Sequence, residues 1–397
     1  MSPITFVAPY YYNTFWYFAL LILTWAIVIY YIGSGEQKLL RSDGHDASQG
    51  FAVLLTFVII YYVGLRPIYR DFVDMKMYAE SYRLFANTYD YQWPSLRSEW
   101  LWIDMFAYFR KHDFSVHTFF LFVELIYVMG MLIGASLVTR NNLLMTMMFM
   151  ITSFSFLSFG ENGIRNGMSC SILLVAICLL PREEKRHKAL AVLLMILAMG
   201  VHRSSMLPIM TSVASLFAIK NTKTAMRFWI ASFGISLVAG PLMEQFFASL
   251  GFDDRMEQYT SVDDATMEST FSKTGFRWDF LLYSAFPIIM IWYVTIYRKF
   301  RDKTYNVIAI TYILCNAFWL MVIRAAYSNR FAYLSWFIYP LVIAYPLLRM
   351  NLWKDQDRRT AIILFFYSLF EFFMFFVYYF GTTGFKGFQL YWWRRGG

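Results

Sequence analysis

The sequence predicts an all-α integral membrane protein, and three observations carry this prediction. Hydrophobic residues make up 59% of the chain, whereas only 15% of its residues are charged. Apolar runs approach the length of about 20 residues with which a helix crosses a bilayer, and they recur from near Asn13 to Phe380. No long polar linker separates these runs. We therefore expect a single polytopic membrane domain over residues 1–397.

The apolar runs define about twelve candidate transmembrane helices. They lie near residues 14–32, 51–65, 115–138, 143–160, 163–180, 188–203, 204–219, 228–247, 279–297, 304–323, 331–348 and 360–380. The first run meets its first cation only at Lys38, after the apolar residues. A secretory signal begins with positive charge instead, so we expect this run to remain as a helix.

Threading the helices in alternation collects the basic loops on one side of the membrane. These loops carry Lys38 and Arg41 and the residues 182–188, 220–227, 298–303 and 349–359. Short loops rich in Lys and Arg stay in the cytoplasm, so this side is expected to be cytoplasmic. Both termini and two long loops, about 66–115 and 248–278, are then expected to face outward. The net charge of +9 follows from these loops, and no basic domain suggests nucleic-acid binding.

The first outward loop contains an amphipathic stretch from Ser98 to Phe109. Its spacing predicts an apolar helix face beside the polar residues Glu99 and Asp104. The face would be formed by Trp100, Leu101, Met105 and Phe106. We expect this helix to be interfacial or re-entrant.

Arg165 and His202 are the main candidates for a functional site. Each lies about 25 to 30 Å along a helix from the basic turn 181–188, so both are expected at one depth on the outward side. Arg165 begins a helix among glycines and asparagines, where a guanidinium and free backbone N–H groups can bind phosphate. His202 can accept a proton near neutral pH. The structural alternatives are lipid-headgroup contact for Arg165 and a simple hydrogen bond for His202.

Further charged residues lie at the outward helix ends and inside the spans. Arg66, Arg70, Asp71 and Asp74 follow the second span, and Arg324 and Arg330 bracket a short turn. The two arginines at the turn are expected to face a common anion or carbohydrate, or else to anchor the helices at the interface. The four residues after the second span form a charged entry, and the alternative is that some of them only pair with each other. Glu124 and Glu371 fall inside spans, where a charged carboxylate is costly without a partner. Such residues suit a proton-coupled transporter, and a neutral, hydrogen-bonded glutamate is the equal alternative.

Three groups of these residues resemble the Wzy-type oligosaccharide polymerases, especially their EpsG-like branch. The stretches Asn162-Gly163-Ile164-Arg165-Asn166-Gly167 and Leu197-Ala198-Met199-Gly200-Val201-His202 look like the family's isoleucine-arginine helix start and its later alanine-x-x-x-histidine helix end. The series Arg66, Asp74, Tyr78 and Glu99 is similar to one that follows the family's second span, although Phe72-Val73 replaces its usual glycine. Arg330 before Phe331-Ala332-Tyr333 resembles the family's late arginine.

The resemblance implies a class C type glycosyltransferase, multi-pass in the bacterial cytoplasmic membrane, with its active site facing the periplasm or the cell exterior. It would join undecaprenyl-diphosphate-linked oligosaccharide repeat units and release undecaprenyl diphosphate, with no metal and no other cofactor. The implied partners are these lipid-linked oligosaccharides, membrane lipid, a chain-length regulator and a flippase. A related glycan ligase and a lipid-linked oligosaccharide flippase or other transporter are the alternatives.

The resemblance also assigns roles to residues. The implied catalytic residues are Arg165, His202 and Arg330. The expected substrate-binding residues are Arg66, Arg70, Asp74, Tyr78, Glu99, Asn162, Arg203 and Arg324, of which Arg70 and Arg324 are added for their places at outward helix ends. The arginines would stabilise the departing diphosphate. His202 would either deprotonate the acceptor hydroxyl or bind phosphate, with Asp74 as the alternative base.

Overall fold

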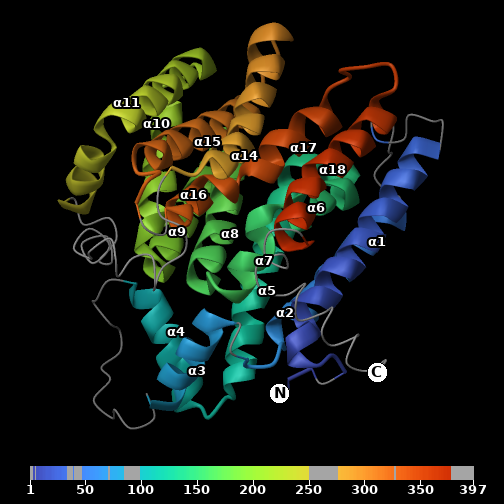
Figure 1. Cartoon of the computed structure of the whole chain (residues 1–397), viewed down its shortest axis with the longest axis vertical. Helices are drawn as coiled ribbons and strands as arrows, with labels where there is room; N and C mark the ends of the chain where they lie inside the picture. Colours follow the sequence, from blue (N-terminus) through green and yellow to red (C-terminus); the bar gives the residue numbers. More distant parts are fainter. Residues whose placement is uncertain are drawn as a thin grey trace, which may run out of the picture.

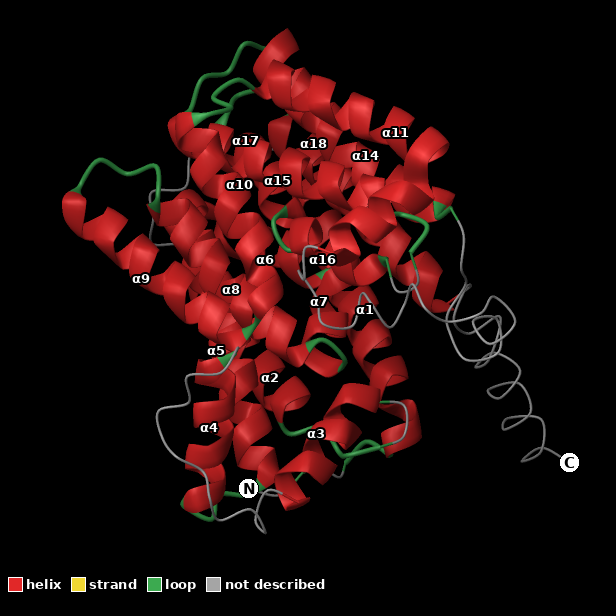
Figure 2. Cartoon of the chain, turned by 90° about the vertical axis from the view of Figure 1, so that its left-hand side faces the viewer, coloured by secondary structure: helices red, strands yellow, loops and turns green. Residues whose placement is uncertain are grey.

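The structure is a computed structural model that describes residues 3–4, 6–33, 39, 47–69, 72–84, 99–249, 276–325 and 328–376. All regular secondary structure in these residues is helical, which confirms the all-α prediction for this part of the chain. The helices lie side by side in an elongated bundle, and α3 and α4 stand together at its lower end in Figure 1. Figure 2 shows the same bundle from the side.

The described residues form helices of very different lengths. In chain order they are α1 (Tyr12–Gly33), α2 (Ala47–Gly64), α3 (Val73–Leu84), α4 (Trp100–Lys111), α5 (Val116–Thr139), α6 (Leu143–Ile151), α7 (Phe154–Glu161), α8 (Ile164–Leu179), α9 (Lys185–Val201), α10 (Met206–Phe217), α11 (Thr222–Ser249), α14 (Trp278–Ile291), α15 (Lys303–Met321), α16 (Asn329–Trp336), α17 (Tyr339–Arg349) and α18 (Gln356–Phe373). Single turns of 3-10 helix span Pro9–Tyr11, Arg140–Asn142 and Arg203–Ser205, and a π-helical segment, Trp292–Tyr297, continues α14.

Six helical segments among the described residues are long and apolar enough to cross a membrane. They are Pro9–Gly33, Val116–Thr139, Trp278–Tyr297, Lys303–Met321, Asn329–Arg349 and Gln356–Phe376. The pair α6 and α7 makes a seventh if it counts as one span, and Ser48–Gly64 and Ile164–Leu179 are shorter apolar helices. These helices indicate a multi-pass membrane protein. The larger number of about twelve spans stays a prediction.

The predicted span 143–160 is broken in the middle, because α6 and α7 meet at an angle of 70°. The hydroxyls of Thr152 and Ser153 turn back to donate hydrogen bonds to the carbonyls of Met148 (2.6 Å) and Met150 (2.8 Å). Side chains that bond to the preceding turn in this way favour a bend. The backbone N–H of Phe154 after the break donates to the hydroxyl of Tyr283 at 3.3 Å, so the interruption leaves this group satisfied.

Helix α4 confirms that the stretch after Ser98 is helical, but the predicted apolar face was partly wrong. The buried side chains include Trp102 and Phe106, and Asp104 is only 5% exposed. The physical reason is that α4 is covered on two sides. Trp102 meets the ring of Phe119 at the start of α5 with 5.2 Å between centroids, while the other side of α4 packs on α9.

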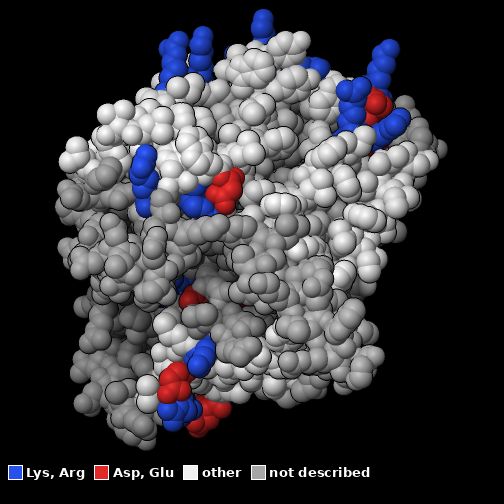
Figure 3. Space-filling view, viewed as in Figure 1, with Lys and Arg blue, Asp and Glu red and all other residues white. Residues whose placement is uncertain are grey.

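Four of the basic loops, at residues 182–188, 220–227, 298–303 and 349–359, lie together at the end of the bundle opposite α3 and α4, whereas Lys38 and Arg41 lie outside the described residues. Nη2 of Arg182 donates to the carbonyl of Leu137 at 3.0 Å, which ties the α8–α9 loop to the end of α5. Nη1 of Arg298 donates to the carbonyl of Leu352 at 2.9 Å, and Nδ2 of Asn306 donates to that of Lys220 at 3.0 Å. Lys and Arg side chains project from this upper edge in Figure 3. The grouping agrees with the threaded topology, whose cytoplasmic orientation stays a prediction.

Candidate active site

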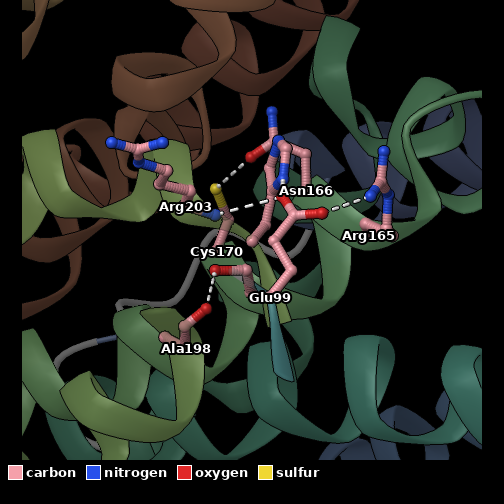
Figure 4. A network of polar contacts seen from close by, with 8 residues as sticks. Glu99, Arg165, Asn166, Cys170, Ala198 and Arg203 are labelled. Carbon is pink, nitrogen blue, oxygen red and sulfur yellow. Dashed lines mark hydrogen bonds and ion pairs between the residues drawn. The ribbon is translucent and has the colours of Figure 1, made fainter. Parts of the chain in front are cut away.

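The carboxylate of Glu99 joins the ends of two further helices. Oε2 of Glu99 accepts a hydrogen bond from Nη1 of Arg165, the second residue of α8. Oε1 lies 2.5 Å from Nδ1 of His202, which follows α9, and it accepts a bond from the backbone N–H of Arg203 at 3.2 Å. We call Glu99, Arg165 and His202 the Glu99 group. Figure 4 shows the carboxylate facing Arg165, while the guanidinium of Arg203 points away from it.

Helices α8 and α9 are held in a register that places Arg165 and His202 at the same level. The hydroxyl of Ser169, one turn into α8, donates to the carbonyl of Ala198 in α9 at 2.9 Å. That α9 ends at Val201 follows from the extended backbone of His202, with φ −151° and ψ 122°. The backbone N–H of His202 still donates to the carbonyl of Ala198 at 3.0 Å. This bond holds the backbone from which the imidazole extends. Arg165 and His202 therefore lie at one level of the bundle, and their depth in the membrane stays a prediction.

The close approach of α4 to α9 depends on Gly200. A Cβ atom at this position would lie 2.8 Å from Cε2 of Trp100 and 3.0 Å from Cβ of Leu101. Any side chain there would push α4 away, so glycine permits the contact. Glu99 directly precedes Trp100 and has a left-handed backbone with φ 59°. The contact at Gly200 therefore fixes the place from which the carboxylate reaches His202.

The Glu99 group is partly buried and strongly polarised. Partial burial raises the pKa of Glu99, but the hydrogen bond with His202 and the positive charge of Arg165 outweigh this effect and lower the pKa to about 2. Glu99 is therefore ionised at neutral pH. The side chains of Arg165 and His202 keep 21% and 22% of their surface exposed, so both remain accessible to a ligand. In Figure 3 the viewed face of the molecule has a hollow near its middle, with a few atoms of Lys or Arg and of Asp or Glu inside it.

Helix α3 adds two of the predicted residues to this site. Cζ of Arg165 lies 5.6 Å from the centre of the Tyr78 ring, within the range of a cation–π contact. The charges of Asp74 and Arg165 also act on each other. Asp74 and Tyr78 thus lie on the α3 side of Arg165, and Glu99 lies on its α4 side. The structure brings together six of the predicted site residues: Asp74, Tyr78, Glu99, Arg165, His202 and Arg203.

Arg66 is buried, with 1% of its surface exposed. Its Nη1 donates to the carbonyl of Val63 at 2.5 Å and its Nη2 to that of Glu161 at 3.3 Å. These contacts lie inside the protein. The buried position of Arg66 therefore does not support the predicted role in binding substrate directly. Arg70, predicted beside it, lies outside the described residues.

Arg324 and Arg330 lie on either side of the connection between α15 and α16. Arg324 is exposed, with Cζ 5.5 Å from the ring centre of Phe276. Arg330 is half-buried, and its charge acts on Tyr333, whose hydroxyl lies 2.9 Å from Oγ of Ser158 in α7. Arg330 is therefore linked to the helix that leads into α8. Asn162, also predicted, is exposed in the turn between α7 and α8.

One carboxylate near this turn received no role from the sequence. Glu161 ends α7, and its Oε2 accepts a hydrogen bond from Nδ2 of Asn13 in α1 at 3.0 Å. Its only signal in the sequence is a charged residue at the end of an apolar run, and nothing local pairs it with a residue 148 positions away. Within the described ranges, no group of three or more His, Cys, Asp or Glu residues could hold a metal ion.

Comparison with known proteins gives one match. A family model with the description EpsG family matches residues 49–391, which is most of the chain. The matched range includes every residue of the Glu99 group and the helices α7 and α8. No curated protein and no solved structure matches the chain.

Proposed function

The chain belongs to the EpsG family, and from this premise we propose that it is a polysaccharide polymerase. It joins oligosaccharide repeat units that are linked to undecaprenyl diphosphate, and it releases undecaprenyl diphosphate. The reaction takes place on the outer face of the bacterial cytoplasmic membrane, in a fold of the class C glycosyltransferase type with about twelve spans. Family membership and the membrane-spanning helices support this proposal.

The observation that carries the chemistry is the bridge from one carboxylate to an arginine and a histidine. A carboxylate on Nδ1 of His202 keeps the proton on that nitrogen and leaves Nε2 as the acceptor. This is the arrangement that a general base needs. Arg165 uses Nη1 for Glu99, and its remaining N–H donors are suited to diphosphate oxygens.

In the proposed reaction the oxygen of an acceptor sugar hydroxyl attacks the anomeric carbon of the donor oligosaccharide. A new glycosidic C–O bond forms as the bond from the anomeric carbon to the diphosphate oxygen breaks. The hydroxyl proton passes to Nε2 of His202, and the diphosphate leaves with the bonding electron pair. Arg165 stabilises the negative charge that develops on this leaving group. Glu99 stabilises the imidazolium that forms.

The remaining predicted residues have supporting roles in this proposal. Tyr78 and Asp74 line the α3 side, and Asp74 is the alternative base. Arg330 and Arg324 contribute positive charge from the α15–α16 connection to the diphosphate. Asn162, Arg203 and Arg70 bind donor or acceptor groups around the site. The lipid-linked oligosaccharide, membrane lipid, a chain-length regulator and a flippase are the proposed partners.

The test is polymerisation by the purified protein from a defined undecaprenyl-diphosphate oligosaccharide. Product lengths are compared for wild type, Arg165→Ala and His202→Ala at equal folded amounts. Lys223→Ala is the control, because Lys223 is an exposed cation at the start of α11, beside the basic loops. We expect a ladder of products from wild type and from the control, and no ladder from the two site variants.

Other outcomes separate the alternatives. A ladder that survives both site substitutions contradicts the assigned site but keeps the polymerase. Transfer of a single oligosaccharide to a different acceptor, without a ladder, favours the ligase. No product from a competent substrate, together with movement of lipid-linked oligosaccharide across vesicles, favours the transporter.

A further inference from the structure

A second set of charged residues is buried where α1, α2, α5 and α7 meet, and the proposed reaction does not use it. Arg66, Glu124 and Glu161 are 1%, 2% and 4% exposed. We call these three residues the buried charge cluster. Arg66 follows α2, Glu124 lies in the middle of α5, and Glu161 ends α7. The charge of Arg66 acts on both carboxylates.

Glu161 has the surroundings of an ionised carboxylate. Its Oε2 accepts a hydrogen bond from Asn13 at 3.0 Å. Its backbone carbonyl accepts one from Nη2 of Arg66 at 3.3 Å, so the guanidinium stands next to this residue. A donor to the carboxylate and a nearby cation both favour the charged form.

Glu124 lacks such surroundings. Its Oε1 is buried without a hydrogen-bond partner. A Cβ atom on Gly160 would lie 3.2 and 3.3 Å from the two carboxyl oxygens, so the carboxyl group packs against the bare backbone of this glycine. Among the described residues, Arg66 forms no ion pair within 4.0 Å with either carboxylate. An ionised Glu124 would thus be buried without a donor or a direct counter-ion, which is costly.

The charges of the cluster lead to the same conclusion. One guanidinium and two ionised carboxylates would leave a net negative charge among apolar helices. Buried carboxylates avoid the cost of an uncompensated charge by binding a proton. When two carboxylates lie close to one cation, one of them holds this proton more often than the other. The carboxyl group with fewer donors retains the proton, and here that group is Glu124.

The tyrosine hydroxyls and the second buried glutamate around the cluster bond to other groups. The hydroxyls of Tyr12 and Tyr62 each donate to the backbone carbonyl of the other, and the hydroxyl of Tyr127 donates to the carbonyl of Phe156 at 3.0 Å. Glu371 accepts a bond from the hydroxyl of Tyr17 at 2.5 Å, and it adds a further carboxylate near Glu161. His117 interacts electrostatically with Arg66. The tyrosine hydroxyls therefore give Glu124 no donor.

We propose that Glu124 is a proton-binding site: the folded protein carries a neutral Glu124 beside an ionised Glu161, whose charge is offset by the nearby guanidinium of Arg66. When Glu124 is neutral, it does not attract the guanidinium of Arg66, which remains bonded to the end of α7. That end is four residues before Arg165, so the bound proton helps to hold the start of α8. This inference does not depend on the reaction proposed above.

The test is infrared spectroscopy of the full chain in detergent at neutral pH, which separates the C=O stretch of a protonated carboxyl group from that of a carboxylate. We expect a protonated-carboxyl band that shifts in D2O and disappears in Glu124→Gln. The band should persist in Glu161→Gln. Glu371→Gln is the control for a second buried glutamate, and in this variant the Glu124 band should also persist.

Thermal unfolding of the same variants provides a second readout. Glutamine mimics a neutral carboxyl group, so Glu124→Gln should unfold at the same temperature as wild type or higher. Glu161→Gln should unfold at a lower temperature, because Arg66 loses its charged partner. A Glu124→Gln protein that fails to fold would contradict the proposal. So would a spectrum in which no protonated-carboxyl band depends on Glu124.

Discussion

Nδ1 of His202 lies 2.5 Å from Oε1 of Glu99, although 103 positions separate the two residues in the sequence. The same carboxylate accepts a hydrogen bond from Arg165, so a general-base candidate and a phosphate-binding candidate share one anion. Moving or neutralising Glu99 should therefore disturb both residues at once.

Glu99→Gln should reduce turnover while the protein remains folded. The amide keeps the size of the side chain but removes the negative charge that orients His202 and stabilises its protonated form. The loss of general-base assistance typically costs about 100-fold or more. Initial rates of glycosidic-bond formation over a range of donor concentrations will separate kcat from KM. Unchanged kcat would show that His202 acts without Glu99.

Arg165→Lys should lower activity almost as much as Arg165→Ala. A lysine has a single ammonium group and cannot bind Glu99 and two diphosphate oxygens in the planar geometry of a guanidinium. A loss of about 100-fold is the size expected when a transition-state donor is removed. Arg186→Lys is the matched control, since Arg186 is 78% exposed and pairs with Glu184 in the α8–α9 loop. Full activity of Arg165→Lys would limit Arg165 to a simple charge effect.

Gly200→Ala should displace α4 from α9. The new Cβ would lie 2.8 Å from the Trp100 ring, and overpacking of this kind costs about 1–3 kcal/mol. We expect a lower unfolding temperature and reduced activity, because Glu99 moves with α4. Gly234→Ala in α11 is the control, since no atom lies within 4 Å of its added Cβ. If both variants behave alike, the close contact at Gly200 does not position Glu99.

Stability in acid should depend on Glu99. Its pKa is about 2 in the folded protein and is taken as 4.5 without these contacts. A lowered folded pKa stabilises the protein above pH 4.5, and this contribution is lost as the pH falls towards about 2. The unfolding temperature of wild type in detergent should therefore fall across this range more than that of Glu99→Gln. Parallel curves for the two proteins would show that Glu99 gains nothing from its partners on folding.

Much of the architecture could be predicted because it depends on local composition. Hydropathy reports how far an apolar run extends, so it predicted the helical spans and the ends at which Arg165 and His202 occur. The positions of the basic loops followed from alternation along the chain. A break inside one apolar run was not visible in this way, because the bend between α6 and α7 depends on Thr152 and Ser153 bonding back to their own helix.

From the sequence alone, one could predict an all-helical, multi-pass protein and expect a histidine and an arginine at one depth. The folded arrangement of the helices was needed to see that Glu99 joins them, that Arg66 faces the interior, and that Glu124 lies against Gly160. The physical reason is that side-chain direction turns by about 100° per residue in a helix. Helices that are apolar on nearly all sides do not reveal which face meets which neighbour. Close packing selects that face, through contacts such as Gly200 on Trp100.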